Sequence, residues 1–480
     1  MAEQMSESVQ QQRQQPQQLH QSQWPQQHDA FDRTLVFESC GSADDDSGLF
    51  FQYRCLEDGL CLPTVHTVLT SDGTAAARAA HLAVHVGMSL LPYLWMERPS
   101  SRILIRVGLP RSATAFWREV YNGVLAEFFL TNRLAPFEPE LIFEGGEAEV
   151  PSEAETLGDG VLVPMGAGKD SIVCYALLRD CLPATKLQWF YVGRSYGEFS
   201  ACGRYRTIAL LESDDEPLVQ EGIALAPEEW KLGYVATGHP FACFVLFSAV
   251  LHASAHGYRY VCVGNERSAN FPDVPGVNHQ WDKSLHFMML VQRYLKDFTS
   301  VHVFSAIQQW WELQIVALFC RMPAAAPYWR LFLSCNQPVQ EQHWCGNCEK
   351  CLFMALCLQS FEEPPRVHEI WGGVDVLCNE ALLPKLREML GQLPKSPPFD
   401  CIGTEEEVGM AAALAVRKCR VSSQAHCRLP YLLKKCGAVS WKAPKPELLL
   451  TQCVEAHVPD WFRPAIVRAN AILSEAAANL

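Results

Sequence analysis

The chain has 480 residues, of which 49% are hydrophobic, and a formal net charge of −14. This length and composition allow a large buried core and exclude a wholly disordered or fibrous protein. The acidic balance argues against nucleic acid and anionic membranes as partners, because both attract Lys and Arg. We therefore expect a globular protein, in which a phosphate-bearing small substrate would need a local basic pocket.

The 20 cysteines are mostly scattered singly through apolar stretches, where thiols behave as small core residues. No signal peptide is recognisable, and the longest apolar run, at 241–251, is too short to span a bilayer. We therefore expect a reducing, cytoplasmic environment. The sequence does not indicate an oligomeric state.

Residues 1–30 are dominated by Gln, and such a tract cannot bury enough surface to offset its chain entropy. We predict a disordered tail, followed by an α+β N-terminal domain at 31–150 and a polar linker that ends at residue 160. The strands and helices expected in this domain lie at 34–39, 48–55, 72–94, 102–108 and 115–133.

Residues 158–334 alternate between apolar strands and helices, a pattern that predicts an α/β domain. We expect a parallel sheet with helices on both faces. The expected strands lie at 161–165, 187–193, 205–211, 258–264 and 300–304, and the helices at 171–179, 241–256, 284–296 and 310–319. A cysteine-rich segment at 335–360 and a mostly helical C-terminal region at 361–480 follow.

A Gly-rich turn follows the buried strand at 161–165 and leads into a helix. Its residues are Gly166, Ala167, Gly168, Lys169, Asp170 and Ser171. Backbone N–H groups and a helix N-terminus suit pyrophosphate, Lys169 adds a cation, and Asp170 can hold Mg²⁺. The spacing differs from the GxxxxGK[ST] loop of kinases. An ordinary strand–turn–helix corner is the alternative interpretation.

This turn resembles the SGGxDS signature of the PP-loop ATP pyrophosphatases. The resemblance implies a PP-loop fold and cleavage of ATP to AMP and pyrophosphate through an adenylated substrate. Ala167 stands where that signature has its second Gly. If the position requires a left-handed backbone, alanine there costs roughly 1–2 kcal/mol.

Cys345, Cys348 and Cys351 form a CxxCxxC motif, and Cys335 precedes it by ten residues. Four thiolates at such short spacing suit a tetrahedral structural zinc site. An iron–sulfur cluster and unliganded thiols are the alternatives, while a thioredoxin-like redox unit has no support elsewhere in the sequence. His343 competes with Cys335 as the fourth ligand.

Two polar segments, 265–270 and 278–284, follow the strand predicted at 258–264. In open α/β sheets, ligands bind at the carboxyl ends of the strands. The candidate residues are Asn265, Glu266, Arg267, Ser268, Asn270, Asn278, His279, Gln280, Lys283 and Ser284. Arg267 can pair with a carboxylate or a phosphate. Solvated loops with helix capping are the alternative, as for the capping box expected of Thr404 and Glu407.

Taken in order, the motifs resemble one family, the bacterial UDP-N-acetylmuramoyl-L-alanyl-L-glutamate epimerases of peptidoglycan synthesis. The resemblance covers residues 31–420. The motifs that carry it are GAGKDS, TGH, NERSAN, NHQWDKS, SCN, WCGNCEKC and PFDCIGTEEE, together with the segment AFWREVYNGVLAEFF.

The resemblance implies that UDP-N-acetylmuramoyl-L-alanyl-L-glutamate is the substrate, that ATP and Mg²⁺ are required, and that AMP and pyrophosphate are released. We expect the loop at 166–171 to hold the triphosphate. Arg267 and Lys283 would neutralise carboxylate or phosphate, and His279 or Glu266 would transfer the proton. The residues expected to bind substrate are Asn265, Ser268, Asn270, Asn278, Gln280 and Ser284.

Two other functions fit parts of the same pattern. Another PP-loop adenylating enzyme, such as an amide ligase or an enzyme of deazaguanine or tRNA modification, would share the loop and the cysteines. A non-catalytic, zinc-stabilised scaffold is the second, and Ala167 is the feature that favours it.

Overall fold

The computed structural model describes residues 31–42, 48–68, 79–147, 157–192, 218–221, 231–235, 240–335, 344–421, 429–437, 450–452 and 454–480. The predicted Gln-rich tail, most of the polar linker, the strand expected at 205–211 and the TGH motif lie outside these ranges. Within them, no helix has the length and apolar character needed to cross a membrane.

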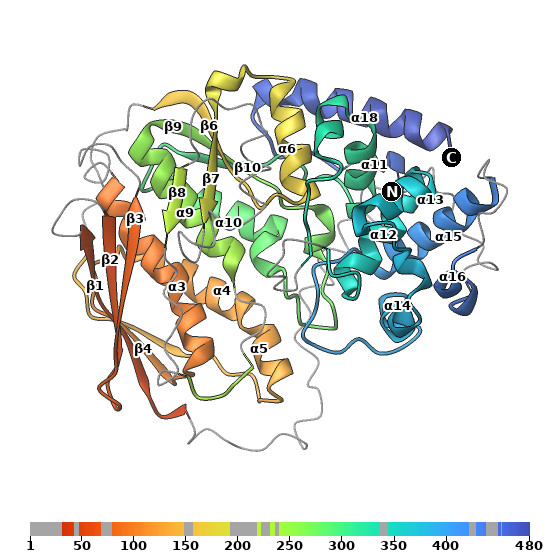
Figure 1. Ribbon diagram of the computed structural model, residues 1–480. Coiled ribbons are helices and arrows are strands. Elements are labelled where there is room, and N and C mark those ends of the chain that lie inside the picture. Colours follow the sequence, from red (N-terminus) through yellow and green to blue (C-terminus); the bar gives the residue numbers. More distant parts are fainter. Residues whose placement is uncertain are drawn as a thin grey trace, which may run out of the picture.

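One continuous ten-stranded sheet organises the chain, in the order β10-β9-β6-β7-β8-β3-β2-β1-β4-β5 (Figure 1). The first five strands in this order are parallel to one another. Their bounds are β6 Gly158–Pro164, β7 Leu187–Val192, β8 Leu218–Glu221, β9 Tyr258–Val263 and β10 His302–Ser305. The predicted α/β class with a parallel sheet is therefore confirmed.

Alternate residues of these strands are buried on opposite faces of the sheet. In β6, Val161 and Val163 belong to one hydrophobic cluster, while Leu162 belongs to another. In β9, Cys262 joins the first cluster and Val261 the second. Burial on both faces explains why these strands are continuously apolar, as parallel strands covered by helices usually are.

Helices cover both faces of the parallel strands. On one face, α9 (Phe241–His256) contacts β9 and β6, and α10 (Leu285–Leu295) contacts β10. On the other, α6 (Lys169–Arg179) packs on β6 and beneath α11 (Glu312–Arg321) and α18 (Arg463–Ala478). The helix expected at 241–256 is thus confirmed at both ends.

The N-terminal part adds the other five strands. The antiparallel meander of β1, β2 and β3 continues into β4 and β5, which are parallel to β1. The bounds are β1 Thr34–Ser42, β2 Gly48–Cys55, β3 Cys61–Val68, β4 Arg102–Ile105 and β5 Glu140–Phe143. Antiparallel pairing of Thr67 with Glu221 joins β3 to β8, so both parts share one sheet.

Three helices of the N-terminal part pack toward the same hydrophobic cluster as α9 and α10. They are α3 (Ala83–Glu97), α4 (Ser112–Val124) and α5 (Ala126–Thr131). The single helix predicted at 115–133 is therefore two helices that meet at Leu125. Of the helix expected at 72–94, the described part is a short 3₁₀ turn followed by α3.

The C-terminal region is mostly helical, as predicted, and gathers at the end of the molecule away from β1–β4 (Figure 1). Its main contact is between α12 and α15. The helices are α12 Glu349–Phe361, α13 Pro364–His368, α14 Leu383–Met389, α15 Glu405–Val421 and α16 Tyr431–Lys435. The division into units at residues 150 and 334 stays a prediction.

Candidate active site

The Gly-rich loop lies where the strand order of the parallel sheet reverses. β6 and β9 are neighbours, but the chain continues from β6 toward β7 and from β9 toward β10 on opposite sides. Such a switch point leaves a crevice at the carboxyl ends of the strands. The two ends are close, because a Cβ built on Gly264 would lie 3.3 Å from the Asp170 Cβ. The loop and the 265–270 segment therefore border one site.

The backbone of the Gly-rich loop is strained at Ala167, where the sequence predicted strain if the position is left-handed. Ala167 has a φ of 59°, in the left-handed region, so the condition for strain at this position is met. A Cβ built on Gly166 would contact no described atom within 4 Å, which leaves open space beside the turn. At Gly168 a Cβ would lie 2.9 Å from Ser334 Oγ, so the loop packs closely on the segment before the cysteine cluster.

Lys169 and Lys350 are buried on either side of the Glu312 carboxylate. Lys169 Nζ pairs with Glu312 Oε2 and lies 2.8 Å from Asp170 Oδ1, and Lys350 Nζ lies 3.4 Å from Glu312 Oε1. Burial opposes the charge on Lys169, yet Asp170 and Glu312 raise its pKa above the usual value. Burial alone would raise the pKa of Glu312, but the lysines lower it to about 2. These charges fix the loop from inside the protein.

Glu266 is the buried carboxylate at the end of β9. The backbone around Glu266 is held by the end of β10 and the segment after it. Ser305 Oγ donates to Asn265 O at 2.7 Å, and Gln308 Nε2 donates to Glu266 O at 3.2 Å. Burial raises the pKa of Glu266 to about 7, although Lys283 opposes the rise. This carboxyl group can therefore accept or donate a proton near neutral pH.

His279 is held by a carboxylate on its own loop. Its Nδ1 lies 2.6 Å from Asp273 Oδ2, which also accepts the His279 backbone N–H at 3.0 Å. Burial would lower the pKa of His279, but Asp273 and Cys401 raise it to about 10. The imidazole is thus protonated at neutral pH, which suits stabilisation of a negative charge better than base catalysis.

Lys283 connects the second polar segment to the C-terminal region. Its Nζ lies 3.3 Å from Gln280 Oε1 and 3.5 Å from Cys401 Sγ. Burial opposes its charge, but Cys401 and Glu266 raise the pKa of Lys283 above its usual value. The ammonium group therefore stays charged between two acidic groups.

Cys401 is the functional candidate that the sequence interpretation missed. The Lys350 ammonium donates to its carbonyl oxygen, and the Phe399 N–H donates to Glu127 Oε1 at 2.7 Å. Helices α12 and α5 thus hold this segment against the site. The only sequence signal was the place of Cys401 in the PFDCIGTEEE motif, next to the capping box.

That capping box is confirmed, and it contributes to the site. Thr404 N and Oγ1 donate to Glu407 Oε2 at 2.8 and 3.1 Å, and Glu407 N donates to Thr404 Oγ1 at 3.3 Å. Glu407 also accepts from Ser268 Oγ at 2.8 Å and from Leu313 N at 3.3 Å. The start of α15 is therefore bonded to the 268 loop and to α11.

Most of the predicted substrate-binding side chains bond within the protein. Asn270 donates to Arg267 O at 2.9 Å and accepts from Leu285 N at 2.6 Å. Asn278 donates to Ala269 O and accepts from Gln280 N, both at 2.8 Å. Ser284 is the N-cap of α10, as the capping interpretation expected. These contacts order the two loops, and direct binding of substrate stays a prediction.

Arg267 lies on an aromatic side chain at the same edge. Its guanidinium carbon is 4.2 Å from the centre of the Trp311 ring, and Phe271 stacks on that ring. A nearby cavity of about 330 Å³ is lined by Ser268, Gln280 and six carboxylates against one lysine. Because so acidic a lining disfavours anions, we locate the phosphates at the loop rather than in this cavity. The lining carboxylates are Asp273, Glu349, Glu388, Asp400, Glu405 and Glu406.

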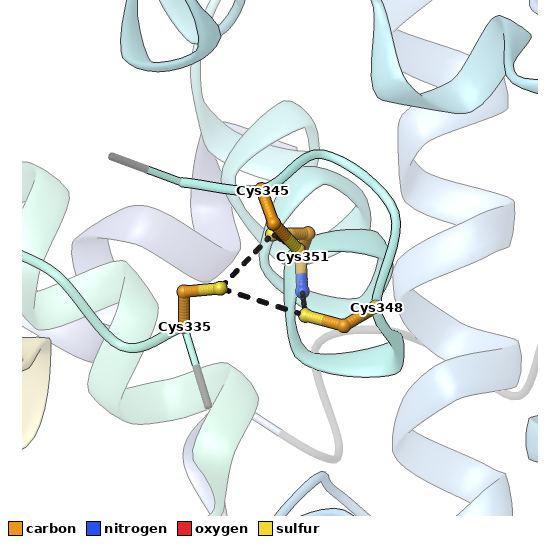
Figure 2. Close-up of side chains that lie close together, drawn as sticks. All are labelled: Cys335, Cys345, Cys348 and Cys351. Carbon is orange, nitrogen blue, oxygen red and sulfur yellow. Dashed lines mark hydrogen bonds between the residues drawn. The ribbon is translucent and has the colours of Figure 1, made fainter. Parts of the chain in front are cut away.

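The four predicted cysteines converge, as Figure 2 shows. Their sulfur atoms all lie within 4.8 Å of one another, and the shortest separations are 3.7–3.9 Å. Thiolates around a tetrahedral zinc, with Zn–S bonds of about 2.3 Å, lie about 3.8 Å apart. The group can therefore bind a metal ion such as zinc. Cys335 takes the fourth position, and His343 lies outside the described residues.

The cysteine cluster is continuous with the Gly-rich loop. Leu333 N donates to Ala167 O at 2.9 Å, and Ser334 packs on Gly168. Cys335 follows directly, and its sulfur lies 3.8 Å from Cys348 Sγ at the start of α12. A metal held by the cysteines would therefore fix the segment against which the loop packs.

Comparisons with known proteins indicate the family of the chain. The chain matches the MurL N-terminal domain over residues 26–305 and the MurL C-terminal domain over residues 331–443. It is similar to proteins named UDP-N-acetyl-alpha-D-muramoyl-L-alanyl-L-glutamate epimerase. The one from Salinispora tropica is 30% identical over 333 residues, 65% of this chain and 68% of the relative. Those from a Micromonospora species and Xanthomonas oryzae pv. oryzae are 27% and 26% identical, over 83% and 80% of this chain and 88% and 87% of each relative.

Proposed function

Because the chain belongs to the MurL family, we propose that it is an ATP-dependent epimerase that converts the terminal L-glutamate of UDP-N-acetylmuramoyl-L-alanyl-L-glutamate to D-glutamate. The observation that carries the ATP-dependent part is the Gly-rich loop at the switch point between β6 and β9. A turn at the carboxyl end of a strand, beside such a switch point, supports the proposal that the GAGKDS motif binds ATP. A cytoplasmic location accords with such a precursor but stays a prediction.

Adenylation solves the chemical difficulty of the inversion. A free α-carboxylate makes the neighbouring C–H group very weakly acidic, because removal of the proton would place two negative charges side by side. Attack of the carboxylate on the α-phosphorus of ATP releases pyrophosphate and leaves an acyl-adenylate without that charge. The α-proton can then leave with its electron pair delocalised as an enolate.

Return of a proton to the opposite face of Cα gives the D-configuration. Water then attacks the acyl carbon, and the bond to AMP breaks, which makes the cycle irreversible. Hydrolysis of ATP thus drives an inversion that would otherwise stop near an equal mixture of the two forms.

In this proposal, the loop at 166–171 holds the nucleotide phosphates in the open space beside Gly166. Asp170 fits Mg²⁺, because its carboxylate is 26% exposed at the helix N-terminus. Bound there, Mg²⁺ would neutralise phosphate charge. The buried Lys169 supports the turn through Asp170 and Glu312.

Two cations are available for the substrate. Lys283 lies between Glu266 and Cys401, where a charged ammonium would stabilise the enolate or the carboxylate. Arg267, stacked on Trp311, is presented on the same edge and can pair with a phosphate or carboxylate. His279, protonated and bonded to Asp273, would add a third positive charge rather than act as a base.

We assign the metal at the cysteine cluster as zinc with a structural role. The tetrahedral sulfur separations support it, because each thiolate of a cubane iron–sulfur cluster binds its own iron and would lie farther from the others. No free coordination position for a substrate is needed, since the proposed chemistry takes place at the sheet edge.

The function is tested by incubating the purified full chain with ATP, Mg²⁺ and UDP-N-acetylmuramoyl-L-alanyl-L-glutamate. Chiral analysis of the glutamate released by acid hydrolysis should show D-glutamate, with one AMP and one pyrophosphate formed per inversion. AMP formation that requires ammonia and a different acid would instead indicate an amide ligase. No binding of ATP by calorimetry in the presence of Mg²⁺ would indicate a non-catalytic scaffold.

A further inference from the structure

We propose that the Cys401 thiolate is a proton-transfer group of this epimerase, which exchanges the α-hydrogen of the activated glutamate on one face of Cα. The inference rests on the function proposed above. It adds a catalytic residue that lies outside the Gly-rich loop and the two polar segments.

The geometry around Cys401 is that of an activated thiol. Its Sγ lies 3.5 Å from the Lys283 ammonium. The second neighbour is the side chain of His279, which is 5% exposed and which also lowers the pKa of the thiol. Asp273 Oδ2 lies 2.6 Å from Nδ1 of His279, so Nε2 is the ring nitrogen that Asp273 does not occupy. Asp273, His279 and Cys401 thus group the residue types that activate sulfur in other enzymes.

The buried Nε2 atom of His279 indicates a role for the group formed by Asp273, His279 and Cys401. Among the described residues, it has no hydrogen-bond partner. A buried imidazole nitrogen left in that state is expensive unless it serves the group beside it. The Asp273 carboxylate fixes the ring orientation and keeps the imidazole protonated, which stabilises a thiolate at Cys401.

Charged groups reach Cys401 from several elements. Lys283 and His279 face it from the second polar segment, and Lys350 from the start of α12. The carboxylates nearby are Asp273, on the loop before His279, and Glu127 of α5. Burial would raise the pKa of Cys401, but the three cations lower it to about 6. A thiolate therefore predominates at neutral pH.

Other buried thiols of the chain show the opposite behaviour. Cys174, Cys243 and Cys357 are buried, and burial, together with nearby carboxylates, raises the pKa of each well above its usual value. Cys401 is partly exposed, and its chain neighbours Asp400 and Ile402 line the cavity of about 330 Å³. A low pKa together with access is the combination that distinguishes a reactive cysteine from a structural one.

The proton balance of the step is simple. The thiolate takes the proton from Cα, so the C–H bond breaks, an S–H bond forms, and the electron pair moves into the acyl carbonyl as an enolate. Glu266, with a pKa of about 7, supplies a proton from the other face in its carboxylic acid form. Lys283 is the charged neighbour of both groups and offsets the enolate charge. Both acids then exchange protons with water, and the next cycle begins.

The test uses Cys401→Ser and Cys401→Ala in the full chain, with ATP, Mg²⁺ and the UDP-dipeptide in D₂O. We expect deuterium uptake at Cα and formation of D-glutamate to fall at least 100-fold. Substrate-dependent release of pyrophosphate should continue, because the sequence places the thiol outside the loop and its sulfur lies beside Lys283 of the second polar segment. Cys378→Ser is the matched control, since it removes an exposed thiol from the same region.

A second measurement needs no variant at the cysteine itself. The rate of Cys401 alkylation by iodoacetamide, followed by mass spectrometry in the wild-type chain, should rise with a midpoint near pH 6. His279→Asn should move that midpoint upward by roughly one pH unit, because a positive neighbour is lost. The substrate and ATP together should protect the thiol.

Three results would overturn the proposal. Cys401→Ala with deuterium uptake within threefold of the wild type would exclude proton transfer by this residue. A thioester between Cys401 and the substrate, trapped by rapid quenching, would make the sulfur a nucleophile instead. An alkylation midpoint above pH 8 would show that Cys401 is mainly a neutral thiol at pH 7. Failure of the proposed function is distinct, because the wild type itself would then release no pyrophosphate with this substrate.

Discussion

The Gly-rich loop and the Cys401 group lie at the same sheet edge but are built in different ways. Six consecutive residues form the loop, and its position follows directly from the buried strand before it. The second group joins His279 and Lys283 to a cysteine more than one hundred residues later in the chain. The comparison suggests that nucleotide binding is encoded locally, while proton transfer depends on how the C-terminal region folds back onto the sheet.

Asp170→Asn is the substitution for which we expect the largest loss of nucleotide chemistry, with the proton-transfer groups left in place. Loss of the carboxylate removes the proposed Mg²⁺ ligand, so substrate-dependent pyrophosphate release should fall roughly 100-fold or more. The alkylation midpoint of Cys401 should remain near pH 6, since the loop and the thiol are separate parts of the site. Asp159→Asn is the control, because Asp159 is an exposed carboxylate on the strand before the loop. Equal loss of both properties would show that the two halves do not act separately.

Ala167→Gly tests the backbone of the loop alone, and we expect only a small change in stability. Glycine adopts the φ of 59° without strain, which stabilises the folded state, but it also raises the conformational entropy of the unfolded chain. Because relief of strain is the larger effect, we expect the free energy of unfolding to rise by roughly 0.5–1 kcal/mol. Urea unfolding measures the change. Arg133→Gly is the matched control, because Arg133 is exposed and has a φ of 53° far from the loop in sequence. A decrease in stability for Ala167→Gly alone would mean that the Ala167 methyl group packs favourably.

The loop, the cysteine cluster and the α/β class could be predicted because each depends on short-range pattern. The alternation of strands and helices predicts the sheet. The CxxCxxC motif brings the sulfurs of Cys345, Cys348 and Cys351 together within seven residues. Cys335 was also predicted, from its place ten residues before the motif, and its sulfur lies 3.8 Å from Cys348 Sγ. Ala167 was correctly identified as a site of possible backbone strain.

The rest depends on contacts that no local pattern records. Glu312 and Lys350 lie within apolar helices, and only the fold shows that they form one charge cluster with Lys169. Pairing of β3 with β8 joins two predicted units into one sheet through a contact between distant strands. Asn270 and Asn278 are polar loop residues in the sequence, but the structure uses both side chains to order the loops.

The most direct test asks whether the α-proton becomes exchangeable only after the carboxylate has been activated. The wild-type chain is incubated in D₂O with the UDP-dipeptide and Mg²⁺, with and without ATP, and deuterium at the glutamate Cα is measured by mass spectrometry. The account predicts deuterium uptake that requires ATP and accompanies pyrophosphate release. Exchange at the same rate without ATP would contradict it, because proton transfer would then need neither the loop nor the adenylate.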